Sequence, residues 1–152
     1  MAIPEAQALI KELDLSPHPE GGHYRRIYTA PAEPGERPAL SMIHYLLQEG
    51  EKSRWHVVGL DEIWIFQHGS ALELVTFHPE HARPEVVNLG PTRTHHLLPA
   101  GRWQAARVTE GFALCVCAVA PAFEFEDFRF IADLPDHDRH FTGPLSQFST
   151  LL

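Results

Sequence analysis

From residue 39 to residue 133 the sequence consists of short apolar segments separated by glycine, proline or charged turns. The segments are rich in β-branched and aromatic residues, which favour strands, and no helical period is visible between them. This pattern predicts a sandwich or closed barrel of antiparallel strands rather than a parallel α/β sheet. The expected strands cover residues 23–30, 39–48, 53–59, 61–67, 71–79, 84–90, 95–101, 103–109, 112–120 and 123–133.

The one clear helical period lies at residues 4–13, where apolar residues recur at every third or fourth position. The turn-rich segment PHPEGG, residues 17–22, ends this helix, because two prolines and two adjacent glycines cannot continue it. A length of 152 residues fits one domain, and we expect its core to cover about residues 5–131. Residues 132–152 have no sustained period, so an irregular C-terminal extension is expected.

The formal net charge is −8, so no global positive field would attract nucleic acid or an anionic membrane. No basic region precedes an apolar run at the start, and no apolar run approaches the length needed to cross a bilayer. We therefore expect a cytoplasmic protein whose partner is a small molecule. Cys115 and Cys117 lie in one apolar strand, and we interpret them as buried reduced thiols.

The segments SRWHVVG and DEIWIFQ are separated by a short turn, so we predict a hairpin. Alternation along the strands puts His56 on one face of the first, and Glu62, Trp64 and Phe66 on one face of the second. If these faces coincide, polar groups converge between apolar walls, which is typical of ligand sites in small barrels.

The run GEKSRWHVVGLDEIWIFQHG resembles the first cupin motif. Gly50, His56, Glu62 and Gly69 fall on the motif, and Val58 replaces its second histidine.

The run PAGRWQAARV resembles the second cupin motif. Pro99 and Gly101 are in place, and Gln104 stands where the motif has a histidine. Relative to the usual cupin ligands, two of four metal-binding positions are therefore changed.

Over roughly residues 5–131 the chain is similar to the small single-domain cupins of the cupin-5 type, relatives of the sugar-nucleotide 3,5-epimerases. The stretches that carry this similarity are LSPHPEGGHYR, MIHYLLQEGEKSRWH, DEIWIFQHGSALEL, LLPAGRWQAAR and VAPAFEFEDF. The resemblance implies an all-β double-stranded β-helix, or jelly roll, with a pocket between the sheets and a homodimeric assembly. The chain departs from the family pattern at Arg26, Val57, Ile65 and Ala122, which concerns the substrate more than the fold.

If a divalent metal is bound, the resemblance makes His56, Glu62 and Gln104 its ligands. Transition metals in proteins normally take three or four donors from histidine, cysteine or carboxylate, and an amide oxygen is a weak donor for zinc or iron. The sequence therefore favours metal-free chemistry over a metal cofactor.

A histidine beside a carboxylate is a minimal general-base pair. With His56 as the base and Glu62 as its partner, the sequence predicts proton abstraction next to a carbonyl, as in an isomerase or epimerase of a carbohydrate-like or nucleotide-linked substrate. The alternatives are a non-catalytic small-molecule-binding cupin and a metal-dependent dioxygenase or lyase.

Further residues are candidates for binding the substrate. Gln104 and Tyr24 could hold a substrate oxygen, Trp64 and Phe66 could form walls, and Arg25 could bind a phosphate or carboxylate through its forked guanidinium. Glu20 could line the mouth of the pocket or, alternatively, cap backbone N–H groups in a rigid turn.

Overall fold

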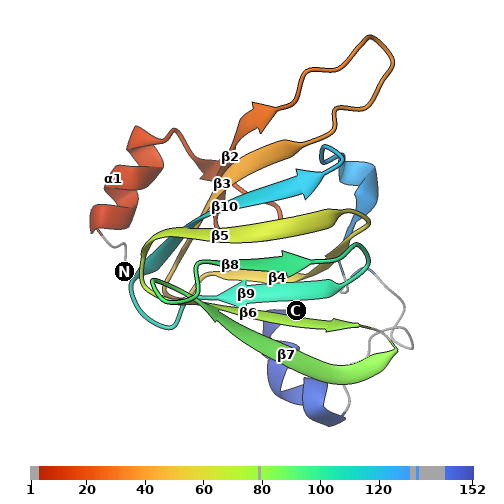
Figure 1. The fold of residues 1–152 in the computed structure, drawn as a ribbon. Coiled ribbons are helices and arrows are strands. Elements are labelled where there is room, and N and C mark those ends of the chain that lie inside the picture. The colour runs from red at the N-terminus through yellow and green to blue at the C-terminus, as the bar shows by residue number, and fades with distance from the viewer. Residues whose placement is uncertain (1–3, 79, 131–132, 134–142) are drawn as a thin grey trace.

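Two antiparallel sheets pack face to face in the computed structural model, which describes residues 4–78, 80–130, 133 and 143–152 (Figure 1). Within these residues, one sheet has six strands in the order β1-β2-β3-β10-β5-β8. Its strands are β1 (Ser16–Pro17), β2 (His23–Thr29), β3 (Ser41–Gln48), β10 (Phe112–Ala120), β5 (Asp61–Gly69) and β8 (His95–Leu98).

The second sheet has five strands in the order β11-β4-β9-β6-β7 within the described residues. Its strands are β11 (Phe128–Phe130), β4 (Lys52–Val58), β9 (Trp103–Arg107), β6 (Leu72–His78) and β7 (His81–Leu89). The two sheets confirm the predicted jelly-roll class, in which sequential strands alternate between layers.

The predicted hairpin between SRWHVVG and DEIWIFQ is wrong. β4 pairs with β9 and β11, whereas β5 pairs with β10 and β8, so the chain crosses from one sheet to the other at the intervening turn. Gly59 in that turn donates its N–H to the carbonyl of Asp127, 2.9 Å away. His56 and Glu62 still line the same cavity, because the inner faces of both sheets point into the same interior.

The main apolar core fills one part of the space between the sheets. Tyr45, Trp64, Leu74 and Cys115 are among its buried residues. Both cysteines are buried and unpaired in β10, as predicted. The other part of the interior, toward His56, is left as a cavity.

The short helix α1 (Pro4–Glu12) covers the outer face of the six-stranded sheet, as Figure 1 shows beside β3 and β10. Its Ala6 is fully buried in a cluster with Leu46 of β3 and Leu114 of β10. Helix residues three and four positions apart therefore supply one apolar face, as the sequence period predicts. In the described part of the chain, no helix is long and apolar enough to span a bilayer.

The C-terminal residues differ from the expected irregular extension where they are described. Gly143–Leu151 form a 3-10 helix, η4, that lies against the five-stranded sheet. Phe148 and Leu151 are buried with Trp55 and Val57, which face outward from β4. The indole N–H of Trp55 donates to the carbonyl of Phe148 at 3.0 Å. The helix therefore covers an apolar sheet face that would otherwise be exposed. Residues 132 and 134–142 of the predicted extension lie outside the described residues.

The segment between β10 and β11 completes the cavity wall, and the loop between β2 and β3 holds it in place. The segment after β10 forms a 3-10 turn, η1 (Phe125–Asp127), before β11. Arg37, from the loop between β2 and β3, donates two N–H groups to the carbonyl of Ala122 and also pairs with the carboxylate of Asp127. These bonds hold the segment that carries Phe123, Phe125 and Phe128, the aromatic segment, across one end of the sandwich.

Candidate functional site

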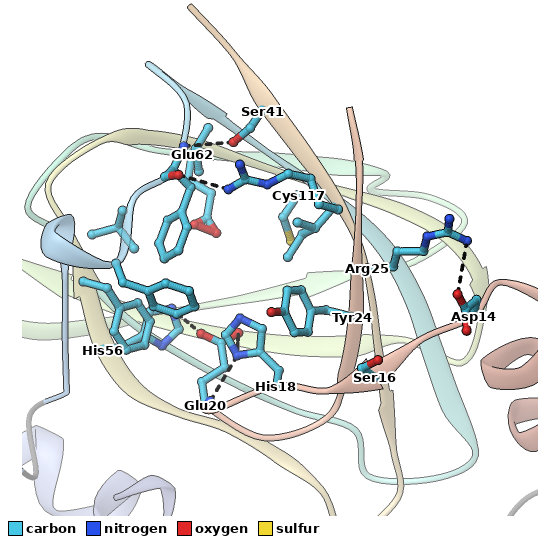
Figure 2. Close-up of a pocket in the computed structure, with 17 residues that line it drawn as sticks. Asp14, Ser16, His18, Glu20, Tyr24, Arg25, Ser41, His56, Glu62 and Cys117 are labelled. Carbon is cyan, nitrogen blue, oxygen red and sulfur yellow. Dashed lines mark hydrogen bonds and ion pairs between the residues drawn. The ribbon is translucent and has the colours of Figure 1, made fainter. Parts of the chain in front are cut away.

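A cavity of about 570 Å³ opens between the two sheets near His56. This volume lies within the range of roughly 300–1,000 Å³ that is usual for small-molecule sites. Polar side chains of the turn before β2 and of β4 and β5 meet apolar residues of β10 and the aromatic segment (Figure 2). The cavity is the candidate site, and its polar wall carries the chemistry.

His56 is 2% exposed, and both of its ring nitrogens have partners. Nδ1 lies 2.7 Å from the backbone carbonyl of Arg54, and Nε2 lies 3.1 Å from Oε2 of Glu20. A carbonyl can only accept a hydrogen bond, so Nδ1 carries a proton. Nε2 and the carboxyl of Glu20 therefore have one proton between them when the pair is neutral. No ion pair or hydrogen bond joins His56 to Glu62 in the described part of the chain, although the charge of each group shifts the pKa of the other, and the carboxyl in direct contact with His56 is that of Glu20.

Glu20 reaches His56 because the segment before β2 folds over β4. The amide of Arg54 donates to the carbonyl of Glu20 at 2.8 Å, and the guanidinium of Arg54 donates to the carbonyl of Pro19 at 2.8 Å. Within the turn, the amide of Glu20 donates to Nδ1 of His18 at 3.1 Å. Figure 2 shows the side chains of Glu20 and His56 directed toward each other with His18 beside them. Of the two roles considered for Glu20, the structure places its carboxyl in the cavity wall.

Glu62 begins the inner face of β5 and is 7% exposed. Its Oε2 accepts a hydrogen bond from Nε2 of Gln104 at 3.2 Å. Among the described residues, no lysine or arginine forms an ion pair with this carboxyl. Burial raises the pKa of Glu62 to about 7, and the nearby His56 offsets only part of this rise. Glu62 can therefore exchange a proton near neutral pH.

The other two acid–base groups shift in the directions that burial dictates. Burial raises the pKa of Glu20 and lowers the pKa of His56. Both shifts favour the uncharged forms, since a desolvated charge is costly. The wall therefore combines the Glu20–His56 contact, where burial disfavours charge on both groups, with a carboxyl whose pKa is raised to about 7.

Gln104 is fixed by two hydrogen bonds. Its Oε1 accepts the indole N–H of Trp64 at 2.8 Å, and its Nε2 donates to Glu62. An indole nitrogen can only donate, so it fixes which end of the amide faces Trp64. The amide therefore presents N–H groups, not its oxygen, to Glu62. Both Gln104 and Trp64 are 1% exposed.

These contacts test whether the residues suit a divalent metal. The oxygen of Gln104 is bound to an indole, and Nε2 of His56 is occupied by the carboxyl of Glu20 at 3.1 Å. Only Glu62 of the three predicted ligands retains an available donor atom. Among the described residues, no group of three or more histidine, cysteine or acidic side chains is arranged to hold a metal ion. As arranged, the three residues do not fit a metal.

The remaining predicted residues are divided between the cavity wall and the packed interior. Tyr24 lines the cavity. Trp64 and Phe66 do not, because they pack in the main core. Gln104 also lies behind the wall, where it supports Glu62 rather than contacting the cavity.

Arg25 lies at the rim of the cavity, and Figure 2 shows it directed away from the acid–base groups toward Asp14. Its guanidinium lies 3.8 Å from the carboxylate of Asp14. Strand alternation from Tyr24 places Arg26, and not Arg25, on the inner face of β2. The alternation that distinguishes Arg26 from Arg25 could be recognised in the sequence, whereas the contact of Glu20 with His56 could not.

Comparison with known proteins agrees with the fold. The family described as Cupin superfamily (DUF985) matches residues 7–131. A protein of known structure from Shewanella oneidensis is 34% identical, with a TM-score of 0.77 over 86% of this chain and 85% of that one. A hypothetical protein from Leishmania major is 25% identical, with a TM-score of 0.80 over 93% of this chain and 97% of that one.

More distant structures share the fold alone. Oxalate decarboxylase from Bacillus subtilis is 15% identical, with a TM-score of 0.65 over 92% of this chain and 37% of that one. No protein with curated annotation matches the chain.

Proposed function

The chain belongs to the cupin superfamily, in the family DUF985, and on that premise we propose that it is an isomerase or epimerase. Its substrate is a small polar metabolite, carbohydrate-like or nucleotide-linked, with a carbonyl next to the carbon that loses a proton. The reaction takes place in the cavity and uses only proton transfers.

The observation that carries this proposal is the setting of Glu62. Its carboxyl lies in the cavity wall, buried, with an amide donor and no cationic ion-pair partner among the described residues. A general base works best when its pKa lies near the operating pH, because it is then available in both protonation states. Proton abstraction from carbon is the chemistry that such a carboxylate supports.

The other groups divide the remaining work. Glu62 accepts the proton from carbon. The proton shared by Glu20 and His56 is available to the carbonyl oxygen, which becomes the hydroxyl of the enol intermediate. Tyr24 lines the same cavity, and its hydroxyl can hold that oxygen. Isomerisation is complete when Glu62 returns its proton to the former carbonyl carbon and the Glu20–His56 pair takes back a proton from the other hydroxyl of the enediol. In epimerisation the pair takes back the enol proton, solvent protonates the same carbon on its opposite face, and Glu62 releases its proton to solvent. Neither outcome involves a redox change.

Solvent deuterium tests the proposal without requiring that the substrate be identified first. A mixture of cellular metabolites is incubated with the protein in D2O, and mass spectrometry then identifies compounds that have gained one deuteron on carbon. We expect at least one such compound with the wild-type protein and none with Glu62→Gln, which keeps the shape of the side chain but cannot accept the proton. Glu110→Gln, a change at an exposed turn residue, is the matched control and should retain full exchange.

The same metabolite mixture, tested for thermal stabilisation of the protein as well as for deuterium uptake, distinguishes the competing functions. A metabolite that stabilises the fold and is recovered without deuterium would make the protein a binding module, since stabilisation follows from binding alone. Exchange that survives Glu62→Gln would assign the base to another residue. Either result would contradict the proposal.

A further inference from the structure

Two consecutive arginines on β2 have opposite placements. Arg25 is the cross-strand partner of His44, and Arg26 is the partner of Ile43. Ile43 lines the cavity, so Arg26 shares the inner face with it. Both arginines are exposed and border the cavity, but the sheet register places only Arg26 on the inner face.

The two arginines also differ in their partners. Arg25 lies 3.8 Å from the carboxylate of Asp14 and donates to the carbonyl of Leu13. For Arg26 the contact seen is a 3.0 Å hydrogen bond from one terminal nitrogen to the carbonyl of Phe123, and no acidic side chain forms an ion pair with it in the described part of the chain. A guanidinium has five N–H donors, and one carbonyl leaves most of them without an acceptor.

The surroundings of Arg26 favour an anion. The protein as a whole has a formal net charge of −8, so an arginine without a carboxylate partner stands out at a cavity wall. The polar wall also holds Glu20, His56 and Glu62, and burial disfavours the charged forms of all three groups. Phe123 and Phe128 also line the cavity and give it an apolar side.

We propose that Arg26 binds an anionic group of the substrate, a phosphate or a carboxylate, at the wall of the cavity. The ligand class is then an anionic carbohydrate, with the charge on Arg26, the apolar face of the sugar on the phenylalanines, and the carbonyl end at Glu62. This assignment of a substrate class rests on the proposed function. The forked guanidinium suits both anions, because it can donate two parallel hydrogen bonds to either.

The test measures anion binding directly and needs no turnover. Inorganic phosphate and succinate are titrated separately into the 15N-labelled protein, and the Nε–H resonances of the arginines are followed by NMR. We expect a saturable shift of the Arg26 resonance with at least one of the two anions, and the stronger of the two identifies the chemistry of the group. Arg26→Gln should weaken that binding at least tenfold, whereas Arg26→Lys, which keeps the charge, should weaken it less.

Arg129→Gln is the matched control, because Arg129 is exposed on β11 and does not line the cavity. It should leave anion binding unchanged. Equal loss in Arg129→Gln, or undiminished anion binding in Arg26→Gln, would overturn the proposal. If Arg26→Gln unfolds at a lower temperature yet binds anions as the wild type does, the role of Arg26 is structural: it holds the backbone at Phe123 through its hydrogen bond to that carbonyl.

Glu62→Gln separates this inference from the proposed function. It should abolish deuterium exchange while leaving phosphate or succinate binding at least as strong as in the wild type. In the wild-type protein, anion binding without deuterium exchange would leave the Arg26 site standing and remove the enzymatic function, and exchange without anion binding would do the reverse.

Discussion

Oε2 of Glu20 lies 3.1 Å from Nε2 of His56, and this contact joins the turn before β2 to the centre of β4. Because Nδ1 of His56 faces the carbonyl of Arg54, the ring can take a proton from Glu20 only through Nε2. The pair therefore behaves as one proton-sharing unit whose geometry depends on the PHPEGG turn.

Removing the carboxyl of Glu20 should destabilise the fold by leaving Nε2 of His56 without a partner. An unsatisfied buried polar atom costs about 1–3 kcal/mol. Glu20→Ala should therefore have a lower free energy of unfolding in urea than Glu20→Gln, which retains a hydrogen-bonding amide, by roughly this amount. Equal stability of the two variants would show that the contact does not matter to folding.

The pKa of Glu62, raised by burial to about 7, predicts how stability changes with pH. The folded state holds this proton more tightly than the unfolded chain, so the contribution of the group is fully present below about pH 4.5 and is lost as the pH rises through 7. Relative to Glu62→Gln, the wild type should lose up to about 3 kcal/mol across this window. Urea unfolding at several pH values measures the difference, and Glu110→Gln should track the wild type throughout.

Gln104 should control the titration of Glu62. Its N–H group donates to the carboxylate and thereby favours the ionised form, so Gln104→Met should raise the pKa of Glu62 further above 7. The carboxyl carbon resonance of Glu62 in a pH titration gives this value directly. Thr76→Val is a suitable control, because Thr76 is buried beside Gln104 in the sheet but donates to the carbonyl of Trp103. An unchanged midpoint in Gln104→Met would contradict the hydrogen-bonding role.

The sequence predicted those parts of the molecule that depend on local pattern. Alternation and turn residues were enough to predict a sandwich or closed barrel of antiparallel strands. The resemblance to cupins specified the jelly roll and indicated that His56 and Glu62 belong to one site. The pairing of β4 and β5 was predicted wrongly, because a short turn can join neighbours in one sheet or cross between two sheets. Only the hydrogen bonds of β4 to β9 and β11 distinguish these possibilities.

Contacts between distant segments could not be predicted in the same way. Nothing local to Glu20 indicates that it reaches His56, since the contact depends on how the turn docks on β4. Gln104 matched a ligand position, yet the direction of its amide depends on Trp64, from the opposite sheet. The apolar residues of η4 lack a sustained sequence period, and the outer face of β4 explains their burial.

Gly21 should be the residue that keeps the Glu20–His56 unit in place. Its φ is +112°, and a Cβ there would lie 1.9 Å from the backbone carbonyl oxygen of Lys52, which is part of β4 and cannot move aside easily. Gly21→Ala must therefore lift the turn from β4, and the carboxyl of Glu20 would move with it. Gly35 also has a positive φ, +84°, but a Cβ there meets nothing within 4 Å, so Gly35→Ala should cost only the roughly 1–2 kcal/mol of a left-handed backbone. We expect Gly21→Ala to unfold at distinctly lower urea concentration than Gly35→Ala and to alter the 15N resonances of the His56 ring, which Gly35→Ala should leave unchanged. If the two variants were equally stable and both kept the His56 resonances of the wild type, the close approach of the turn to β4 would not be what positions Glu20.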